Sequence, residues 1–127
     1  MAQIQDNFKR GTAEFLVLSL LNEGEAMHGY RITQEMQQRS EGRYTILEGT
    51  LYLLMTRMEE EGFVNSHVVL VGKRRTRRYY SITPKGKEHL LMLLQSFDEI
   101  MLGIDLILGR KDTHRYEQSS QPISESH

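Results

Sequence analysis

Apolar side chains recur at helical spacing in the middle of the chain. Between Glu48 and Gly62 the apolar positions lie three or four residues apart, which places them on one side of an amphipathic helix: Leu51, Leu54, Met55 and Met58. Gly62 supplies a stop for this helix. The last turn holds the three glutamates 59–61, where negative charge opposes the helix dipole and repels phosphate. A nucleic acid would therefore meet the N-terminal half of the helix.

The period changes after Gly62. Residues 63–71 are rich in β-branched side chains and contain no helix breaker, which predicts a strand. Gly72 interrupts this strand, and residues 77–82 are expected to return as the second strand of an antiparallel hairpin. Tyr79 and Tyr80 are consecutive, so one is expected in the core and the other on the opposite face of the sheet.

Two further helices are predicted upstream. The first covers roughly Gly11–Asn22 and is closed by Gly24. Phe15 and Leu18 lie off its core stripe and Phe8 precedes it, so this helix has more apolar surface than one core contact requires. We expect a second contact with a partner subunit, although singly exposed apolar residues are also ordinary. The stripe itself consists of Ala13, Leu16, Val17, Leu20 and Leu21.

The second helix opens at His28-Gly29-Tyr30 and runs to about Arg39. Ile32 and Met36 lie four residues apart and would share its buried side. Tyr30 is expected in the core as well. Residues 40–43 form the turn that leads to the helix of residues 48–62.

The last helix is the longest. Thr83-Pro84 predicts its start, with a hydroxyl cap and proline at the first helical position, and Gly109 ends it after Leu108. Such a helix extends beyond a small three-helix core, because about 25 residues span roughly 37 Å. A two-fold related copy would bury its far half, whereas packing within the monomer is the alternative. Six apolar residues alternate spacings of three and four, as in a heptad pattern: Leu90, Leu93, Phe97, Ile100, Ile104 and Ile107. Leu94, Met101 and Leu108 widen this stripe by one position.

Positive charge is concentrated at the tip of the hairpin. Residues 73–78, KRRTRR, carry five positive charges in six residues. Lysine and arginine neutralise phosphates with salt-sensitive affinity, and arginine enters narrow minor grooves. A basic turn can also be simply solvated, but this one follows a helix with an uncommitted outer face, and the combination favours nucleic acid. Alternation along the strand prevents all five charges from reaching one partner.

Composition narrows the class of protein. The 127 residues suffice for one small domain, and the formal net charge of −1 means that the basic tip is a local feature. The absence of cysteine excludes disulfides and fits a reducing cytoplasm, where we expect the protein to reside. No signal peptide and no apolar run of about 18 residues is present, so no membrane partner is expected.

Enzyme chemistry is not expected. The five histidines are scattered, and no pair has the spacing of metal ligands. No glycine-rich phosphate loop or nucleophile motif occurs either. The sequence therefore predicts no catalytic residue, no metal and no cofactor.

Four motifs occur in order along the chain: His28-Gly29-Tyr30, Gly49-Thr50-Leu51-Tyr52, residues 57–62 (RMEEEG), and residues 78–83 (RYYSIT) with Gly86. Over about Phe8 to Leu108 they resemble the PadR family of bacterial transcriptional regulators. Leu53 departs from that pattern, since the family usually has proline after the tyrosine. The resemblance implies a mainly α fold with a small β-hairpin, namely a winged helix-turn-helix over residues 1–83 and a dimerisation helix over 84–109. Residues 110–127 are polar and have no period, so we expect a disordered tail there.

A homodimeric, ligand-responsive repressor that reads an inverted-repeat operator in double-stranded DNA is the function we expect. Leu53 would meet a thymine methyl group, and Arg57 would reach guanine or phosphate. His28 is equally explained as a helix cap, and Lys9 with Arg10 as a solvated pair. The predicted DNA contacts on the recognition helix are Thr50, Tyr52, Leu53 and Arg57, and those on the wing are Lys73, Arg74, Arg75 and Arg77. Four further residues are expected to contact the DNA backbone: His28, Gly29, Lys9 and Arg10.

The resemblance also implies an effector site. In short PadR-like proteins the dimer interface can hold a flat apolar ligand against an aromatic residue of the last helix, and that position corresponds to Phe97. Phe8 and Phe15 would face Phe97 across the interface, with Met101 beside it. A planar hydrophobic effector fits such a site. The alternative is that the three phenylalanines are plain dimer core.

Two other classes of function remain open. A winged helix can serve as a protein-interaction module, for which the acidic residues 59–61 offer a surface. A small-molecule binding protein without DNA function is also possible, but it leaves the charge of the hairpin tip unexplained.

Overall fold

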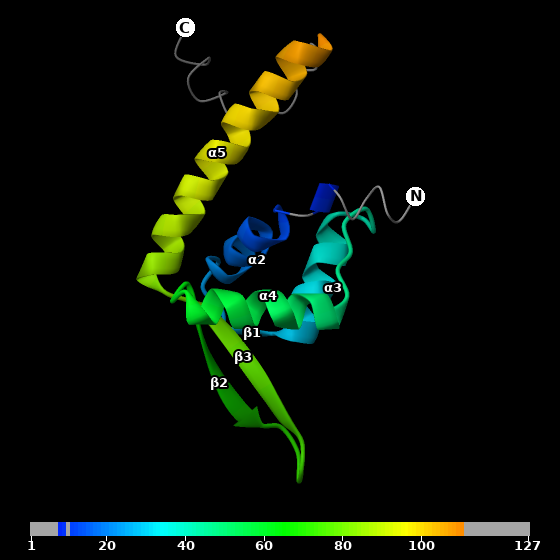
Figure 1. Cartoon of the computed structure of the whole chain (residues 1–127). Coiled ribbons are helices and arrows are strands. Elements are labelled where there is room, and N and C mark those ends of the chain that lie inside the picture. The colour runs from blue at the N-terminus through cyan, green and yellow to red at the C-terminus, as the bar shows by residue number, and fades with distance from the viewer. Residues whose placement is uncertain (1–7, 10, 111–127) are drawn as a thin grey trace, which may run out of the picture. The chain divides into compact units, whose positions relative to one another are not determined.

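The computed structural model describes residues 8–9 and 11–110 (Figure 1). The predictions for Arg10, for a frayed start over residues 1–7 and for a disordered tail beyond Arg110 lie outside the described residues. The chain divides after Leu94 into two compact units. The first unit carries the predicted helices and hairpin, and the second contains the C-terminal half of the last helix.

The elements of the first unit follow the predicted order. Within residues 11–110, three helices precede the hairpin, and the last helix begins immediately after it. The hairpin strands are the longer pair of a three-stranded antiparallel sheet with the order β1-β3-β2. The elements are α2 (Ala13–Leu21), β1 (Met27–His28), α3 (Gly29–Arg39), α4 (Glu48–Glu60), β2 (Val64–Leu70), β3 (Thr76–Ile82) and α5 (Pro84–Leu108).

Strand β1 was not predicted. It has only two residues, and it pairs Met27 with Tyr80 and His28 with Tyr79 on β3. Two residues are too few to display a period, so the hydrophobic pattern carries no sign of this strand. Its pairing places the start of α3 beside the base of the hairpin.

Helix α4 is amphipathic as predicted. Leu51, Met55 and Met58 are at most 1% exposed, and Leu54 is half-buried. Gly62 follows the helix with a φ of +84°, a left-handed conformation that glycine adopts without steric cost. The inward side of α4 is therefore fixed by the core.

The core extends further around α2 than predicted. Phe15 is 6% exposed and Leu18 is fully buried, so the expectation that both lie off the core stripe is wrong. Val17, Leu20 and Leu21 are buried as predicted, whereas Leu16 is only half-buried. An α-helix surrounded by packing partners buries more than one stripe, and periodicity alone does not reveal such a case.

Helix α3 buries Ile32 and Met36 but not Tyr30. The side chain of Tyr30 is 56% exposed, so its assignment to the core is wrong. Tyr30 lies two residues before Ile32, and two residues turn an α-helix by about 200°. The same spacing that places Ile32 inward therefore places Tyr30 outward.

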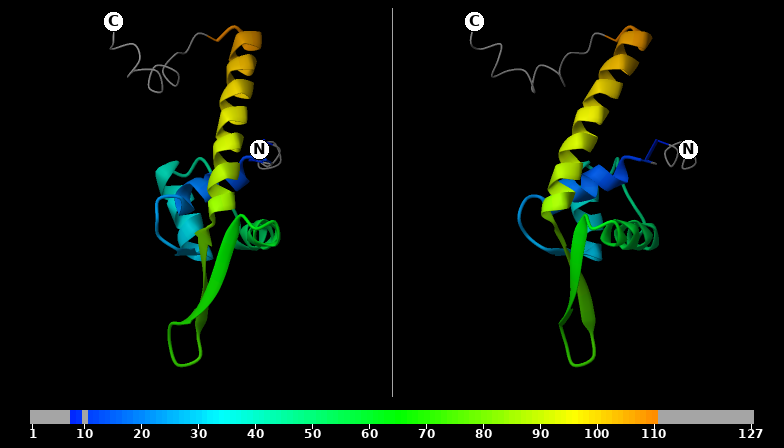
Figure 2. Two further views of the ribbon diagram at one scale, coloured as in Figure 1. Left: turned by 90° about the vertical axis from the view of Figure 1, so that its left-hand side faces the viewer. Right: turned by 60° about the vertical axis from the view of Figure 1, so that its left-hand side comes forward.

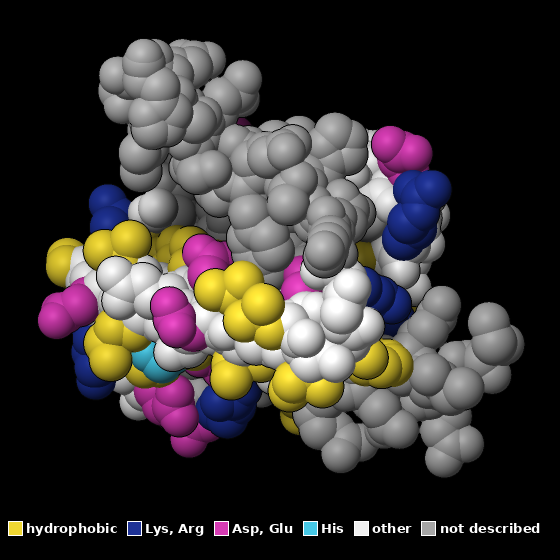
Figure 3. Space-filling model, turned by 90° about the horizontal axis from the view of Figure 1, so that it is seen from above, with side chains coloured by type: hydrophobic (Ala, Val, Ile, Leu, Met, Phe, Trp, Pro, Cys, Tyr) yellow, Lys and Arg dark blue, Asp and Glu magenta, His cyan; other side chains and the backbone are white. Residues whose placement is uncertain are grey.

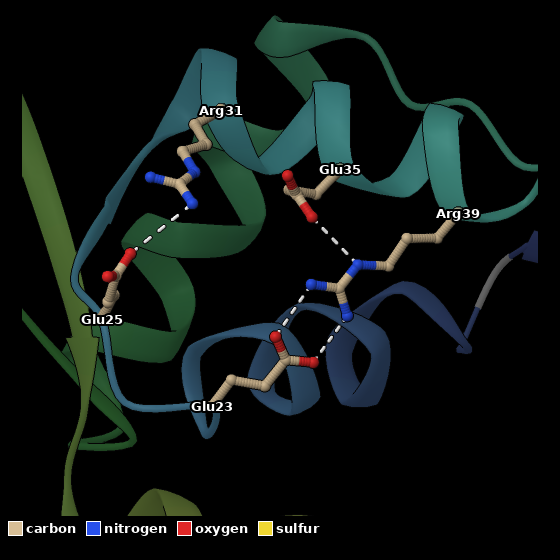
Figure 4. A network of polar contacts seen from close by, with 5 residues as sticks. All are labelled: Glu23, Glu25, Arg31, Glu35 and Arg39. Carbon is tan, nitrogen blue, oxygen red and sulfur yellow. Dashed lines mark hydrogen bonds and ion pairs between the residues drawn. The ribbon is translucent and has the colours of Figure 1, made fainter.

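An ion-pair network fastens the end of α2 to α3 (Figure 4). The guanidinium of Arg39 lies 2.9 Å from the Glu35 carboxylate and 2.5 Å from that of Glu23, and Arg31 lies 3.5 Å from Glu25. The hydrogen bond from Arg39 holds the pKa of Glu23 below its usual range, and the two carboxylates raise the pKa of Arg39. The pairs are exposed, so water and salt weaken them.

Helix α5 begins at the predicted cap. The Thr83 hydroxyl accepts from the Gly86 amide at 2.9 Å and donates to the Gly62 carbonyl at 2.6 Å. Leu90 is 2% exposed, so this residue belongs to the core of the single chain and its assignment to a dimer interface is corrected. The two consecutive tyrosines of β3 lie as predicted, because Tyr80 is buried while Tyr79 is half-buried on the other face of the sheet.

The second unit exposes much of its apolar surface. In the part of α5 after Leu94, Ile100 is 63%, Ile104 is 40% and Ile107 is 86% exposed, whereas Phe97 and Met101 are half-buried. These five residues belong to the predicted heptad pattern. Gly109, with a φ of +73°, follows the helix end as predicted.

Replacing Gly86 by alanine should destabilise the protein. A β-carbon at Gly86 would lie 2.8 Å from Cγ1 of Ile82 and would overlap the carbonyl oxygen of Phe63, which belongs to the backbone and cannot step aside. We expect a loss of about 1–3 kcal/mol in the free energy of unfolding, measured by urea denaturation. Gly103 on the same helix is the matched control, because a β-carbon there meets nothing within 4 Å. Unchanged stability of G86A would contradict the packing described.

Acid should weaken the start of α3. Nδ1 of His28 accepts from the Arg31 amide at 3.4 Å, and burial followed by the charges of Arg77 and Arg31 lowers the pKa of His28. The unfolded chain therefore takes up this proton first, and stability falls as the pH drops below about 6.5. H28N keeps a capping acceptor without titrating. Urea denaturation at neutral and acid pH should show a smaller loss in H28N than in the wild type, and equal losses would refute this role.

Candidate nucleic-acid interface

The outer side of α4 presents three of the predicted DNA contacts. Thr50, Leu53 and Arg57 follow one another at spacings of three and four, so they share a side of the helix opposite to the buried methionines. Leu53 is 70% exposed and the Arg57 side chain 54% exposed. A nonpolar side chain with so much exposure, flanked by a hydroxyl and a guanidinium, suits the floor of a DNA major groove.

Arg57 is not free in this structure. One terminal nitrogen lies 3.1 Å from the Glu14 carboxylate on α2, and the other lies 4.0 Å from Glu61. These partners hold the guanidinium near the C-terminal end of the outer side. Sequence reasoning did not identify Glu14, because its partner is far away along the chain.

The wing is the hairpin of β2 and β3. In both views of Figure 2 the hairpin extends beyond α4, and its tip meets no helix. Lys73, Arg74 and Arg75 lie in the exposed turn, where the Val71 amide donates to the Arg75 carbonyl at 2.9 Å. The tip can therefore approach a polyanion with three adjacent positive charges.

The remaining two basic residues of the wing, Arg77 and Arg78, lie on β3 and contact different partners. Arg78 donates to the Ser66 hydroxyl at 2.9 Å, and this hydroxyl donates to Glu59 at 2.7 Å. Arg77 lies near the imidazole of His28, whose pKa its charge helps to lower. The five charges are thus divided, as the strand alternation predicted.

A cavity of about 280 Å³ opens where the wing meets the starts of α3 and α4. Its lining includes both arginines of β3 together with Glu48. Four of the predicted DNA contacts, His28, Gly29, Tyr52 and Arg77, come together here, although they lie on four different elements. The lining consists of His28, Gly29, Tyr30, Glu48, Leu51, Tyr52, Met55, Arg77, Arg78 and Tyr80.

Aromatic side chains order the edge of this cavity. The His28 ring stacks with Tyr30 at 6.5 Å between centroids and meets Tyr79 edge-on at 5.3 Å. Tyr79 in turn stacks with His67 of β2 at 5.8 Å. Tyr30 and Arg78 were not among the predicted contacts. The helical period of α3 could have identified Tyr30, because a helix that buries Ile32 and Met36 turns Tyr30 outward.

Lys9 is not among the residues that line the cavity. Lys9 donates to the Thr45 carbonyl at 2.7 Å, in the loop between α3 and α4. Of the predicted effector-site residues, Phe8 is 79% exposed, Phe97 and Met101 are half-buried, and Phe15 is buried. The premise that Phe15 offers spare apolar surface is therefore wrong, although the effector site itself stays a prediction.

Charge is mixed on the side opposite the wing tip. Figure 3 views the molecule from above the orientation of Figure 1, and there the described acidic and basic side chains are interspersed rather than gathered into patches of one sign.

Among the described residues, no group of three or more His, Cys, Asp or Glu side chains is arranged to hold a metal ion. No helix in residues 8–9 and 11–110 is long and apolar enough to span a bilayer.

Known proteins resemble this chain in sequence and in structure. A protein of Lysinibacillus sphaericus, described as uncharacterised, is 30% identical over 105 residues, which cover 83% of this chain and 95% of that protein. A PadR family transcriptional regulator from Eggerthella lenta superposes with a TM-score of 0.74 at 28% identity, over 84% of this chain and 90% of its own.

Two further crystal structures are similar. A transcriptional regulator from Clostridium thermocellum gives a TM-score of 0.72 at 29% identity, over 78% of this chain and 95% of its own. Bacillus subtilis PadR in complex with operator DNA shares the fold, with a TM-score of 0.60 at 22% identity over 65% of this chain and 47% of its own. The sequence pattern of the transcriptional regulator PadR-like family matches residues 17–91. The chain therefore belongs to the PadR-like family of transcriptional regulators.

Proposed function

We propose that this transcriptional regulator is a ligand-responsive repressor that binds an inverted-repeat operator as a homodimer in the cytoplasm. Members of its family are transcriptional regulators and not enzymes. The observation that carries the proposal is the convergence of α3, α4 and the wing around one cavity, with α4 offering Leu53 and Arg57 outward beside it.

Each part of this surface would recognise a different part of DNA. The outer side of α4 would enter the major groove, where the apolar Leu53 favours a thymine methyl group and Arg57 favours guanine. The wing tip would contact the phosphate backbone or the minor groove through Lys73, Arg74 and Arg75. Bacillus subtilis PadR, which shares the fold, is known in complex with operator DNA, and this supports the proposal.

The exposed apolar face of α5 supports a homodimer. Ile100, Ile104 and Ile107 would remain in water in a monomer, and each such side chain gains about 1.5–3 kcal/mol on full burial. A second copy of the same helix offers a complementary apolar stripe. Two-fold symmetry would then present two recognition helices to half-sites about one helical turn apart.

An effector would act through the same dimer. A planar hydrophobic molecule beside Phe97 and Met101, with the exposed Phe8 as a further aromatic partner, would shift the protein toward the dimer state that it binds more tightly. Repression would be lifted when, in the favoured state, the distance between the two recognition helices no longer matches the spacing of the operator half-sites.

Removing two charges from the wing tip should weaken binding to all DNA sequences alike. In the double variant R74A/R75A, two phosphate contacts would be lost, and the slope of log affinity against log salt should fall by about 1–2. Fluorescence anisotropy with duplexes of unrelated sequence measures both quantities. K87A is the control, because Lys87 is an exposed cation on α5 rather than on the wing. Unchanged affinity and slope in R74A/R75A would remove the wing from the interface.

A charge on the apolar face of α5 should separate the subunits. The wild-type chain is expected to sediment as a dimer at micromolar concentration, and I104E as a monomer, because burying an unpaired carboxylate is costly. L106E is the matched control, since Leu106 is 72% exposed but lies on the opposite side of α5 from the heptad residues. A monomeric wild type in analytical ultracentrifugation would contradict the homodimer.

A further inference from the structure

One carboxylate joins three elements of the first unit. Glu14 of α2 places one oxygen 3.1 Å from the Arg57 guanidinium of α4 and the other oxygen 2.6 Å from Nε2 of His89 on α5. The Glu14 side chain is only 15% exposed, and that of His89 is 26% exposed. Both oxygens thus have a partner, and each partner comes from a different helix.

The imidazole is held in place from its other side. The His89 ring stacks on Phe63 at 4.0 Å between centroids, with the planes 6° apart. The Lys85 ammonium lies 5.5 Å from the centre of the same Phe63 ring and donates to the Glu61 carbonyl at 2.8 Å. The stacking fixes the plane of the imidazole, and the hydrogen bond to Glu14 keeps Nε2 turned toward the carboxylate.

Arg57 is the member of the cluster that faces outward. Its side chain is 54% exposed on the side of α4 that also carries Thr50 and Leu53. A guanidinium has five N–H donors in a planar fork, so donors remain for a further partner after Glu14 has accepted from one terminal nitrogen. A free arginine loses side-chain entropy when it is ordered on DNA, and an arginine that is already held loses less.

We propose that Glu14 is a positioning residue for operator recognition, which orients Arg57 toward DNA. This proposal rests on the DNA-binding function proposed above. Glu14 does not touch DNA in this account. It fixes the direction of the guanidinium, while its negative charge offsets part of the attraction between Arg57 and phosphate.

The test uses the full chain and two duplexes, one selected by the wild type from a randomised DNA pool and one scrambled. Replacing Glu14 by glutamine frees Arg57 and removes a negative charge. The ratio of the two affinities should fall roughly tenfold, which is the discrimination of one well-placed arginine. Binding to the scrambled duplex should not weaken. A merely structural role for Glu14 would reduce both affinities together.

Three further variants separate the explanations. R57A should lose the same selectivity, and E14Q/R57A should lose no more than R57A alone, because Glu14 acts through Arg57. E35Q is the matched control, since Glu35 also pairs with an arginine but in the network of α3.

The outcomes distinguish this proposal from the function on which it rests. If the wild type selects a duplex but E14Q keeps the full selectivity, the role of Glu14 is refuted and DNA recognition stands. If the wild type prefers no duplex at all, the proposed function fails and the positioning role fails with it. Should E14Q not fold, E14D keeps the charge but draws the carboxylate back from Arg57, and the same loss of selectivity is expected.

Discussion

The burial of one side of α4 is the constraint on which the rest of this structure depends. Leu51, Met55 and Met58 are locked in the core, and each contributes roughly 1.5–3 kcal/mol through its burial. With that side fixed, the helix can present only its opposite side to a partner. The outward placement of Leu53 and Arg57 is a consequence of packing and requires no further interaction to maintain it.

The fold also determines where the charged side chains lie. The chain has a formal net charge of −1, so overall attraction to DNA is not a property of the whole molecule. The packing of the hairpin against α4 and β1 instead gathers positive side chains at the wing tip and around the cavity. Acidic side chains at Glu59 and Glu14 restrain Arg78 and Arg57 by hydrogen bonds, directly or through Ser66, so that specific geometry accompanies the charge. An unrestrained basic tip would provide attraction without selectivity.

Sequence periodicity predicted the elements that have a strong period or a clear cap. The buried stripe of α4, the hairpin, and the start of α5 at Thr83 follow from local rules and were confirmed. Strand β1 was not predicted, because two residues are too few to show a period. Phe15 was assigned to the outside of the core because periodicity did not show that α2 is buried on more than one side. The cavity and the Glu14 cluster depend on contacts between residues far apart in the chain. Such contacts leave no trace in the spacing of neighbouring residues, so a single sequence does not contain them in readable form.

The central claim is that the α4 face and the wing together read a specific DNA sequence. The most direct measurement is the affinity of the purified chain for the DNA upstream of its own coding sequence and for a scrambled duplex, each titrated against salt. The account predicts a preference for the natural upstream sequence of about a thousandfold or more, with both affinities falling as salt rises. No binding to either duplex at low salt would contradict it and would favour a protein-interaction module in its place.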